Sequence, residues 1–128
     1  MKCLSAIVVA AGAFALAGCA HENHTEQLAD QVTRAIVAND MRPVAPEFNA
    51  LVRPKLMQHE QVGRLADQLA PLGNFKRTKE NTPAGTPAGT HQLIAEFERG
   101  TRVEDLTFDS EGKIAAFHLH SASESSAR

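Results

Sequence analysis

Leu106–Phe117 reads LTFDSEGKIAAF. Two short, mainly apolar stretches, LTF and KIAAF, flank the tetrapeptide DSEG at 109–112. Aspartate, serine and glycine favour tight turns, and Gly112 can adopt the positive φ that a hairpin turn needs. The stretch therefore predicts a β-hairpin that joins a strand at Arg102–Phe108 to a strand at Lys113–His120.

Two further strands precede this hairpin. His91–Arg99 alternates Leu93, Ala95 and Phe97 with Ile94, Glu96 and Glu98, which is typical of a strand, and ERGT at 98–101 predicts the turn that follows it. Asn74–Glu80 predicts the first strand. The segment between them, 81–90, contains TPAG twice, and its prolines and glycines predict a long loop. The four strands predict an antiparallel meander.

The chain before Gly73 has a helical period instead. Thr25–Asn39 places Leu28, Val32, Ala35 and Ile36 on one helix face, and the three-residue spacing of Asn23 and Glu26 is that of a capping box. Gln58–Leu72 predicts a helix that Gly73 ends, with an apolar stripe made of Val62, Leu65, Ala66, Leu69 and Leu72. Between them, Arg42–Val52 predicts a helix with Val44, Phe48 and Leu51 inward, ended by Pro54. Helices followed by a meander predict an α+β domain with helices on one sheet face.

The N-terminus predicts export. Lys2 is followed by LSAIVVAAGAFAL at 4–16, an uncharged apolar run typical of a signal peptide and shorter than the roughly 20 residues that span a bilayer. Leu16, Ala17, Gly18 and Cys19 follow the order of the bacterial lipobox, and this resemblance implies cleavage before Cys19. A plain secreted protein with an incidental cysteine is the alternative.

The lipobox resemblance also implies the modification of Cys19. Its thiol would carry a diacylglycerol and its amine a further acyl chain, and two or more chains give stable membrane attachment. Ala20, rather than aspartate, follows the cysteine, which favours the outer membrane facing the periplasm. We therefore expect a signal peptide at 1–18, a lipidated tether at 19–24, one domain at 25–120 and a frayed tail at 121–128.

Charge and cysteine content exclude several functions. Without residues 1–18 the chain keeps 12 basic and 15 acidic side chains, and no basic cluster is present to bind nucleic acid. Cys3 leaves with the signal and Cys19 carries lipid, so no thiol is left for a disulfide, for catalysis or for a metal. The lipid is the only cofactor-like group that we expect.

The motifs LGNF (72–75), AEFERGT (95–101) and LTFDSEGKIAAF (106–117) resemble those of small cystatin-like domains related to nuclear transport factor 2. More narrowly, they resemble a family of unknown function found in bacterial lipoproteins and ahead of some hydrolase domains. The resemblance implies a helix cradled by a curved four-stranded antiparallel sheet, sometimes an apolar pocket, and often a homodimer. It implies no particular activity, because this fold supports enzymes, binders and scaffolds.

Two kinds of chemistry are open to the strands. Ketosteroid isomerase and other enzymes of this fold use a carboxylate base with a tyrosine donor. Glu96, Glu98, Glu104 and Asp105 are candidate carboxylates, but the chain has no tyrosine. His118 and His120 lie on one face of the last strand, about 6.6 Å apart, and could share a metal ion if His91 or a neighbouring carboxylate completed the site. A solvated sheet face explains the same residues without any site.

We expect a non-catalytic binding or scaffold domain. A cavity lined by Phe75, Phe97, Phe108 and Phe117 would favour a small apolar ligand. An exposed apolar sheet face would favour a partner protein or a homodimer. A metal-binding lipoprotein that uses His118 and His120 is the first alternative, and an enzyme of the cystatin-like fold is the second.

Overall fold

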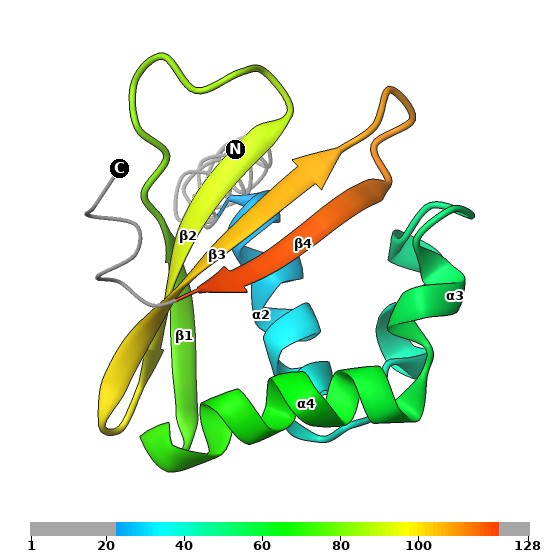
Figure 1. The fold of residues 1–128 in the computed structure, drawn as a ribbon. Coiled ribbons are helices and arrows are strands. Elements are labelled where there is room, and N and C mark those ends of the chain that lie inside the picture. Colours follow the sequence, from blue (N-terminus) through cyan, green and yellow to red (C-terminus); the bar gives the residue numbers. More distant parts are fainter. Residues whose placement is uncertain (1–22, 121–128) are drawn as a thin grey trace, which may run out of the picture.

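The computed structural model describes residues 23–120, and the predicted signal, lipidation site and tail lie outside these residues. The domain combines helices with one four-stranded antiparallel sheet, so the predicted α+β class is confirmed (Figure 1). The strands are β1 (Phe75–Glu80), β2 (Thr90–Phe97), β3 (Gly100–Phe108) and β4 (Ile114–His120). They pair in chain order, β1-β2-β3-β4, as the meander predicts. β1 and β4 are therefore the two edges of the sheet.

The hairpin between β3 and β4 forms as predicted, with Gly112 at a φ of 80°. The Asp109 carboxylate accepts hydrogen bonds of 2.9 Å from the backbone N–H groups of Glu111 and Lys113, which closes the turn from inside. The bond from Lys113 N–H contributes most to holding the pKa of Asp109 below its ordinary value. One residue of β4 bulges near the turn, where Phe108 pairs with Ile114 and Thr107 with Ala116.

The loop between β1 and β2 consists of two copies of one turn. The N–H of Thr86 bonds to the carbonyl of Pro83 at 3.2 Å, and the N–H of Thr90 bonds to the carbonyl of Pro87 at 3.1 Å. Gly85 and Gly89 have φ values of 88° and 87° at the same place in each turn. The duplicated TPAG sequence therefore gives a duplicated structure.

Helix α2 (His24–Val37) begins where the capping pattern predicts. The side chain of Asn23 accepts a 2.7 Å hydrogen bond from the N–H of Glu26. Glu26 does not complete the capping box, because its carboxylate accepts a 2.7 Å bond from the N–H of Glu80 on β1 instead. The same two sequence positions thus cap the helix and attach its first turn to the sheet.

One polar pair attaches the middle of α2 to β1. Asp30 accepts hydrogen bonds from the N–H and the hydroxyl of Thr78, at 2.7 and 2.6 Å. Helix α2 packs most extensively on β1 and then on α4, and it also contacts β2 and η1. Its predicted stripe is buried, as are most of the apolar residues that face it, and this core comprises Leu28, Val32, Ala35, Ile36, Val62, Leu69, Leu93, Ala95, Phe97, Leu106 and Ile114.

The segment after α2 differs from the prediction. Instead of one helix over Arg42–Val52, the structure has a 3-10 helix, η1 (Arg42–Glu47), that ends before Phe48. Pro46 disfavours helical geometry at the residue before it and lacks an N–H for the helix ladder. Phe48 is extended, with φ −93° and ψ 144°, and forms a parallel bridge with Ile114 of β4.

Two further predictions for this segment are wrong. Leu51 points outward and is 86% exposed, because the helix that would turn it inward ends before Phe48. The Asn49 side chain accepts hydrogen bonds from the N–H groups of Leu51 and Val52, which makes a turn here. Pro54 does not end a helix but lies in the first turn of α3 (Arg53–Leu56), where its missing N–H costs no hydrogen bond.

The last predicted helix is present as α4 (His59–Leu69) continued by a short 3-10 helix, η2 (Ala70–Leu72). Val62, Leu69 and Leu72 are buried, whereas Leu65 and Ala66 are half-buried. Gly73, at φ 82°, ends the segment as predicted. In Figure 1, α4 crosses below the sheet and α3 stands to the side of β4.

Candidate functional site

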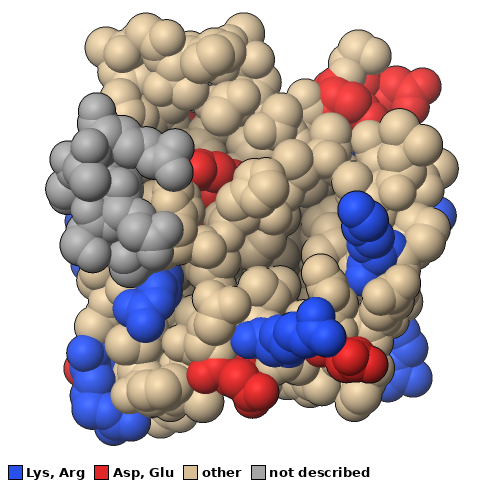
Figure 2. All heavy atoms as spheres, in the orientation of Figure 1, with Lys and Arg blue, Asp and Glu red and all other residues tan. Residues whose placement is uncertain are grey.

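A groove of about 470 Å³ lies between β4 and the helices α3 and α4. Figure 2 shows it as a hollow near the centre of this face, with an uncharged surface inside and both basic and acidic side chains around it. Its β4 wall is formed by every residue from Ala115 to Leu119. The helices and the segment before them contribute the opposite wall, which consists of Val52, Lys55, Leu56, Gln61 and Leu65.

The groove exists because the helices do not cover the sheet evenly. On the sheet, helix α2 contacts mainly β1 and β2. Phe117 and Leu119, on β4, pack against the edge of the core and stay half-buried. Leu56 and Leu65 are half-buried on the opposite wall. Apolar surface that the fold leaves partly uncovered on both sides of a groove is typical of a binding site.

The polar residues of the groove include a cation but no acidic group. Lys55, Gln61 and His118 are exposed, and no acidic residue lines the groove. Lys55 forms no ion pair with any residue in the described part of the chain. The groove therefore offers the unpaired positive charge of Lys55 beside the apolar side chains of its two walls.

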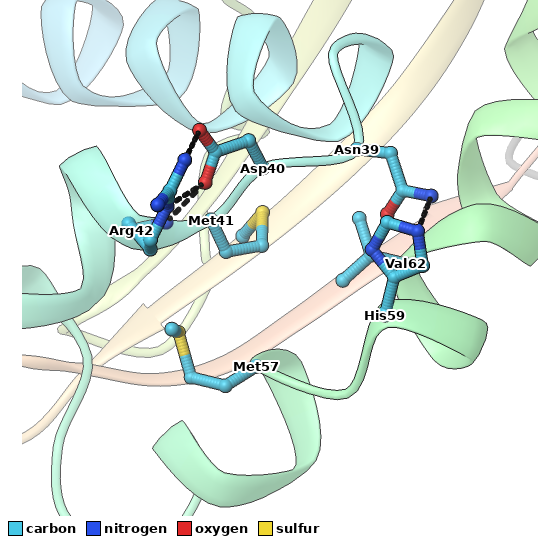
Figure 3. Close-up of a pocket in the computed structure, with 7 residues that line it drawn as sticks. All are labelled: Asn39, Asp40, Met41, Arg42, Met57, His59 and Val62. Carbon is cyan, nitrogen blue, oxygen red and sulfur yellow. Dashed lines mark hydrogen bonds and ion pairs between the residues drawn. The ribbon is translucent and has the colours of Figure 1, made fainter.

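A second pocket, of about 360 Å³, lies where α2 ends and α4 begins (Figure 3). Its polar side chains bind one another. Arg42 forms an ion pair with Asp40 at 2.8 Å, and this interaction lowers the pKa of Asp40 to about 2. Asn39 contacts His59 across the pocket at 3.2 Å, which links the two helices. The remaining wall is formed by Met41, Met57 and Val62. These pairings give the pocket a structural role at this helix junction.

Glu104 is the most unusual of the predicted carboxylates. It is fully buried on β3 and faces α2, where its Oε2 lies 2.6 Å from the hydroxyl of Thr33. The Thr33 hydroxyl also donates a 2.8 Å bond to the carbonyl of Ala29. A hydroxyl has one proton, so a protonated Glu104 that donates to Thr33 satisfies both contacts.

Burial and, to a smaller extent, the nearby Asp30 raise the pKa of Glu104 to about 8, against the opposing effect of its hydrogen bond to Thr33. Its Oε1 has no hydrogen-bond partner within residues 23–120. Glu104 is not among the residues that line the groove. The protonated side chain of Glu104 therefore has a structural role, since it lets α2 pack on the sheet without burying a charge.

The other three carboxylates lie apart from one another. Glu96 forms an ion pair with Arg77 at 2.9 Å, and this bond lowers the pKa of Glu96. Glu98 accepts a 2.9 Å hydrogen bond from the N–H of Asn74, just before β1. Asp105 lies 2.9 Å from His120. Each has a structural partner, and none of them lines the groove.

The histidines of β4 are not part of a complete metal site. His118 is paired in register with Asp105, and His120 bonds to the same aspartate. His91 pairs with Leu106, and Leu106 pairs with Phe117. Paired residues share a face of the sheet and successive residues alternate between faces, so His91 lies on the opposite face from His118. Within residues 23–120, no three His, Cys, Asp or Glu side chains come together. The metal site at His118 and His120 stays a prediction.

The structure does not gather the four phenylalanines around the groove. Phe75 packs edge-on against Phe97, with ring centroids 5.3 Å apart, and Phe108 packs against His91. Phe117 alone of the four lines the groove.

Sequence reasoning missed the residues of the opposite wall, Lys55, Leu56, Gln61 and Leu65. The absence of Asp, Glu, Lys and Arg from Ile114–His120 was a sequence signal for the β4 wall only, and the opposite wall is brought there by the tertiary structure.

The predicted lipobox, Leu16 to Cys19, lies outside the described residues. In the described part of the chain, no helix has the length and apolar character needed to cross a membrane. Comparison of the chain with protein-family models, with curated proteins and with solved structures gave no match.

Proposed function

We propose that this chain is a lipid-anchored, non-catalytic binding domain of the bacterial cell envelope, held at the outer membrane and facing the periplasm. The groove between β4 and the helices α3 and α4 is its binding site. The observation that carries the proposal is the half-buried apolar surface on both walls of that groove, together with the unpaired Lys55.

The fold is of the cystatin-like kind in this proposal. Support comes from α2, which packs on β1 and β2 and is attached to the sheet through Asp30 and Glu26. A helix held against a meander in this way leaves the far strand accessible for binding.

The proposal favours binding over catalysis because the chemistry and the groove are separated. Glu96, Glu98 and Asp105 have other partners, and Glu104 is buried beneath α2. Phe117 and Leu119 instead give the β4 wall of the groove an apolar surface. Burial of this surface by a ligand is favourable. An open groove also fits an elongated partner better than a small enclosed ligand.

The membrane anchor is tested by fractionation. Wild-type protein is expected in the outer-membrane fraction, and the Cys19→Ser variant is expected to leave it. Mass spectrometry of the N-terminal peptide is expected to show a diacylglycerol and an N-acyl group on Cys19. An unmodified thiol there would contradict the anchor.

The binding site is tested by crosslinking in living cells. A photoreactive amino acid replaces Gln61, which lines the groove, and in a matched variant it replaces Asp67, which is exposed on the same helix but outside the groove. We expect one defined crosslinked product from position 61 and none from position 67. Equal products from both positions would reject the groove as the binding site.

A further inference from the structure

The two edges of the sheet differ in charge. β1 reads FKRTKE, and four of its six residues are charged. β4 reads IAAFHLH and contains no Asp, Glu, Lys or Arg. An edge strand presents unpaired N–H and C=O groups, and proteins commonly use charged side chains, especially lysine, to prevent other strands from pairing there. β1 is protected in this way and β4 is not.

The chain itself already pairs with the start of the β4 edge. Phe48 forms a parallel bridge with Ile114, and the N–H of Asn49 donates a 2.9 Å hydrogen bond to the carbonyl of Ile114. Within residues 23–120, no strand continues this pairing along Ala115–Leu119, because β4 is the last strand of the sheet. Those five residues are the ones that form the β4 wall of the groove.

We propose that the groove binds an extended peptide segment of a partner protein, which adds to the sheet as a fifth strand along Ala115–Leu119 of β4. This inference rests on the proposed function and names the class of partner. A strand rises about 3.3 Å per residue, so the open edge accommodates roughly five residues of the partner. Main-chain hydrogen bonds supply affinity in this mode, and the groove selects the side chains.

The opposite wall determines which segments fit. Leu56 and Leu65 face an inserted strand with half-buried apolar surface, so the segment carries apolar side chains at alternate positions. Lys55 adds an unpaired positive charge at the rim, and the lining contains no acidic residue. The partner segment therefore carries a carboxylate beside its apolar side chains.

The first test uses synthetic peptides and the protein as isolated from the envelope, held in phospholipid nanodiscs. The probes are two fluorescent eight-residue peptides that alternate valine and threonine. One carries a single glutamate at its N-terminal end and the other carries it at its C-terminal end. Empty nanodiscs give the background. In two further versions the backbone nitrogens of the odd or of the even residues are methylated. Only one of these sets points toward β4 in an added strand. We expect that set to weaken binding by at least about tenfold and the other to have little effect.

The second test reverses a charge. In the Lys55→Glu variant we expect weaker binding of the glutamate peptide and recovered binding of a peptide with lysine in its place. The matched control is Lys76→Glu on β1, an exposed lysine outside the groove, which is expected to leave both affinities unchanged. Both changes are at exposed positions, so neither is expected to unfold the domain.

Four results would overturn the inference. Equal effects of the two methylation patterns would mean that no strand forms, and equal effects of the two lysine variants would mean that Lys55 does not select the peptide. Sedimentation that shows a dimer broken by β4 substitutions would assign the edge to a second copy of the chain. Absence of peptide binding at millimolar concentration would also reject it. If crosslinks from position 61 persist in that case, the groove remains a binding site for another ligand, and if they are also absent, both proposals fail.

Discussion

Thr33 on α2 and Glu104 on β3 lie 71 residues apart in the sequence, and their side-chain oxygens lie 2.6 Å apart in the core. Both residues are fully buried. The contact joins the helix to the sheet inside the core. It also makes part of the stability of the fold depend on the protonation of Glu104, and this dependence can be measured.

We expect the Glu104→Gln variant to change how stability depends on pH. The pKa of Glu104 is about 8 in the folded chain, against an ordinary value of 4.5. Between these values the folded state binds the extra proton, so its contribution to stability is complete below about pH 4.5 and is lost as pH rises toward 8. The unfolding constant then rises by up to about tenfold per pH unit from this group.

Glutamine carries a donor and an acceptor like the protonated acid, and it has no charge to lose. Denaturant unfolding of the two proteins is therefore expected to give similar stability at pH 5 and a more stable variant at pH 8.5. A constant difference between the proteins over this range would show that Glu104 does not titrate in the folded state.

Replacing Thr33 by valine tests the other half of the contact. Valine has nearly the same shape but no hydroxyl, so Oε2 of Glu104 would be buried without its partner. We expect a loss of about 1–3 kcal/mol in the free energy of unfolding. Thr33→Ser keeps the hydroxyl and is expected to lose less. Equal losses in the two variants would assign the effect to packing of the methyl group.

Gly73 is expected to tolerate alanine poorly. At φ 82°, alanine is strained, and its Cβ would lie 2.6 Å from Oε1 of Glu98. Gly85 has nearly the same φ, 88°, but nothing lies within 4 Å of its Cβ position. Gly85→Ala therefore measures the strain alone. Thermal unfolding is expected to show a larger fall in Tm for Gly73→Ala, unless the Glu98 side chain moves aside without cost, in which case the two falls would match.

Two neighbouring apolar residues are expected to respond very differently to truncation. Phe48 is 1% exposed and Leu51 is 86% exposed. Phe48→Ala removes a core side chain and is expected to cost about 3–5 kcal/mol. Leu51→Ala is expected to stay within about 0.5 kcal/mol of wild type. Urea unfolding of both variants checks this, and a large loss at Leu51 would support the single helix that the sequence pattern favours.

Local patterns in the sequence were sufficient for most of the fold. The DSEG turn, the alternation through His91–Arg99 and the stripe ended by Gly73 each involve neighbours a few residues apart, and all three predicted elements are present. Phe48 could not be placed in this way, because its backbone pairs with Ile114, 66 positions later. A contact between distant segments overrode the helical spacing of Val44, Phe48 and Leu51.

The candidate site was harder to predict for the same reason. Its β4 wall is one short stretch of sequence, but Lys55 and Leu65 come from helices that only the tertiary structure brings opposite that strand. Glu104 was one of four candidate carboxylates, and its burial depends on where α2 crosses the sheet. Alternation in a strand assigns a residue to a face, and it does not show which helix covers that face.

The doubled turn between β1 and β2 has a consequence for how this protein can vary. Each four-residue unit closes its own hydrogen bond, from Thr86 to Pro83 and from Thr90 to Pro87. Copies can therefore be gained or lost in whole steps while strand alignment in the sheet stays fixed. Natural variants that differ by multiples of four residues here would keep the same domain with a longer or shorter loop between β1 and β2. This loop is a suitable place to insert an epitope.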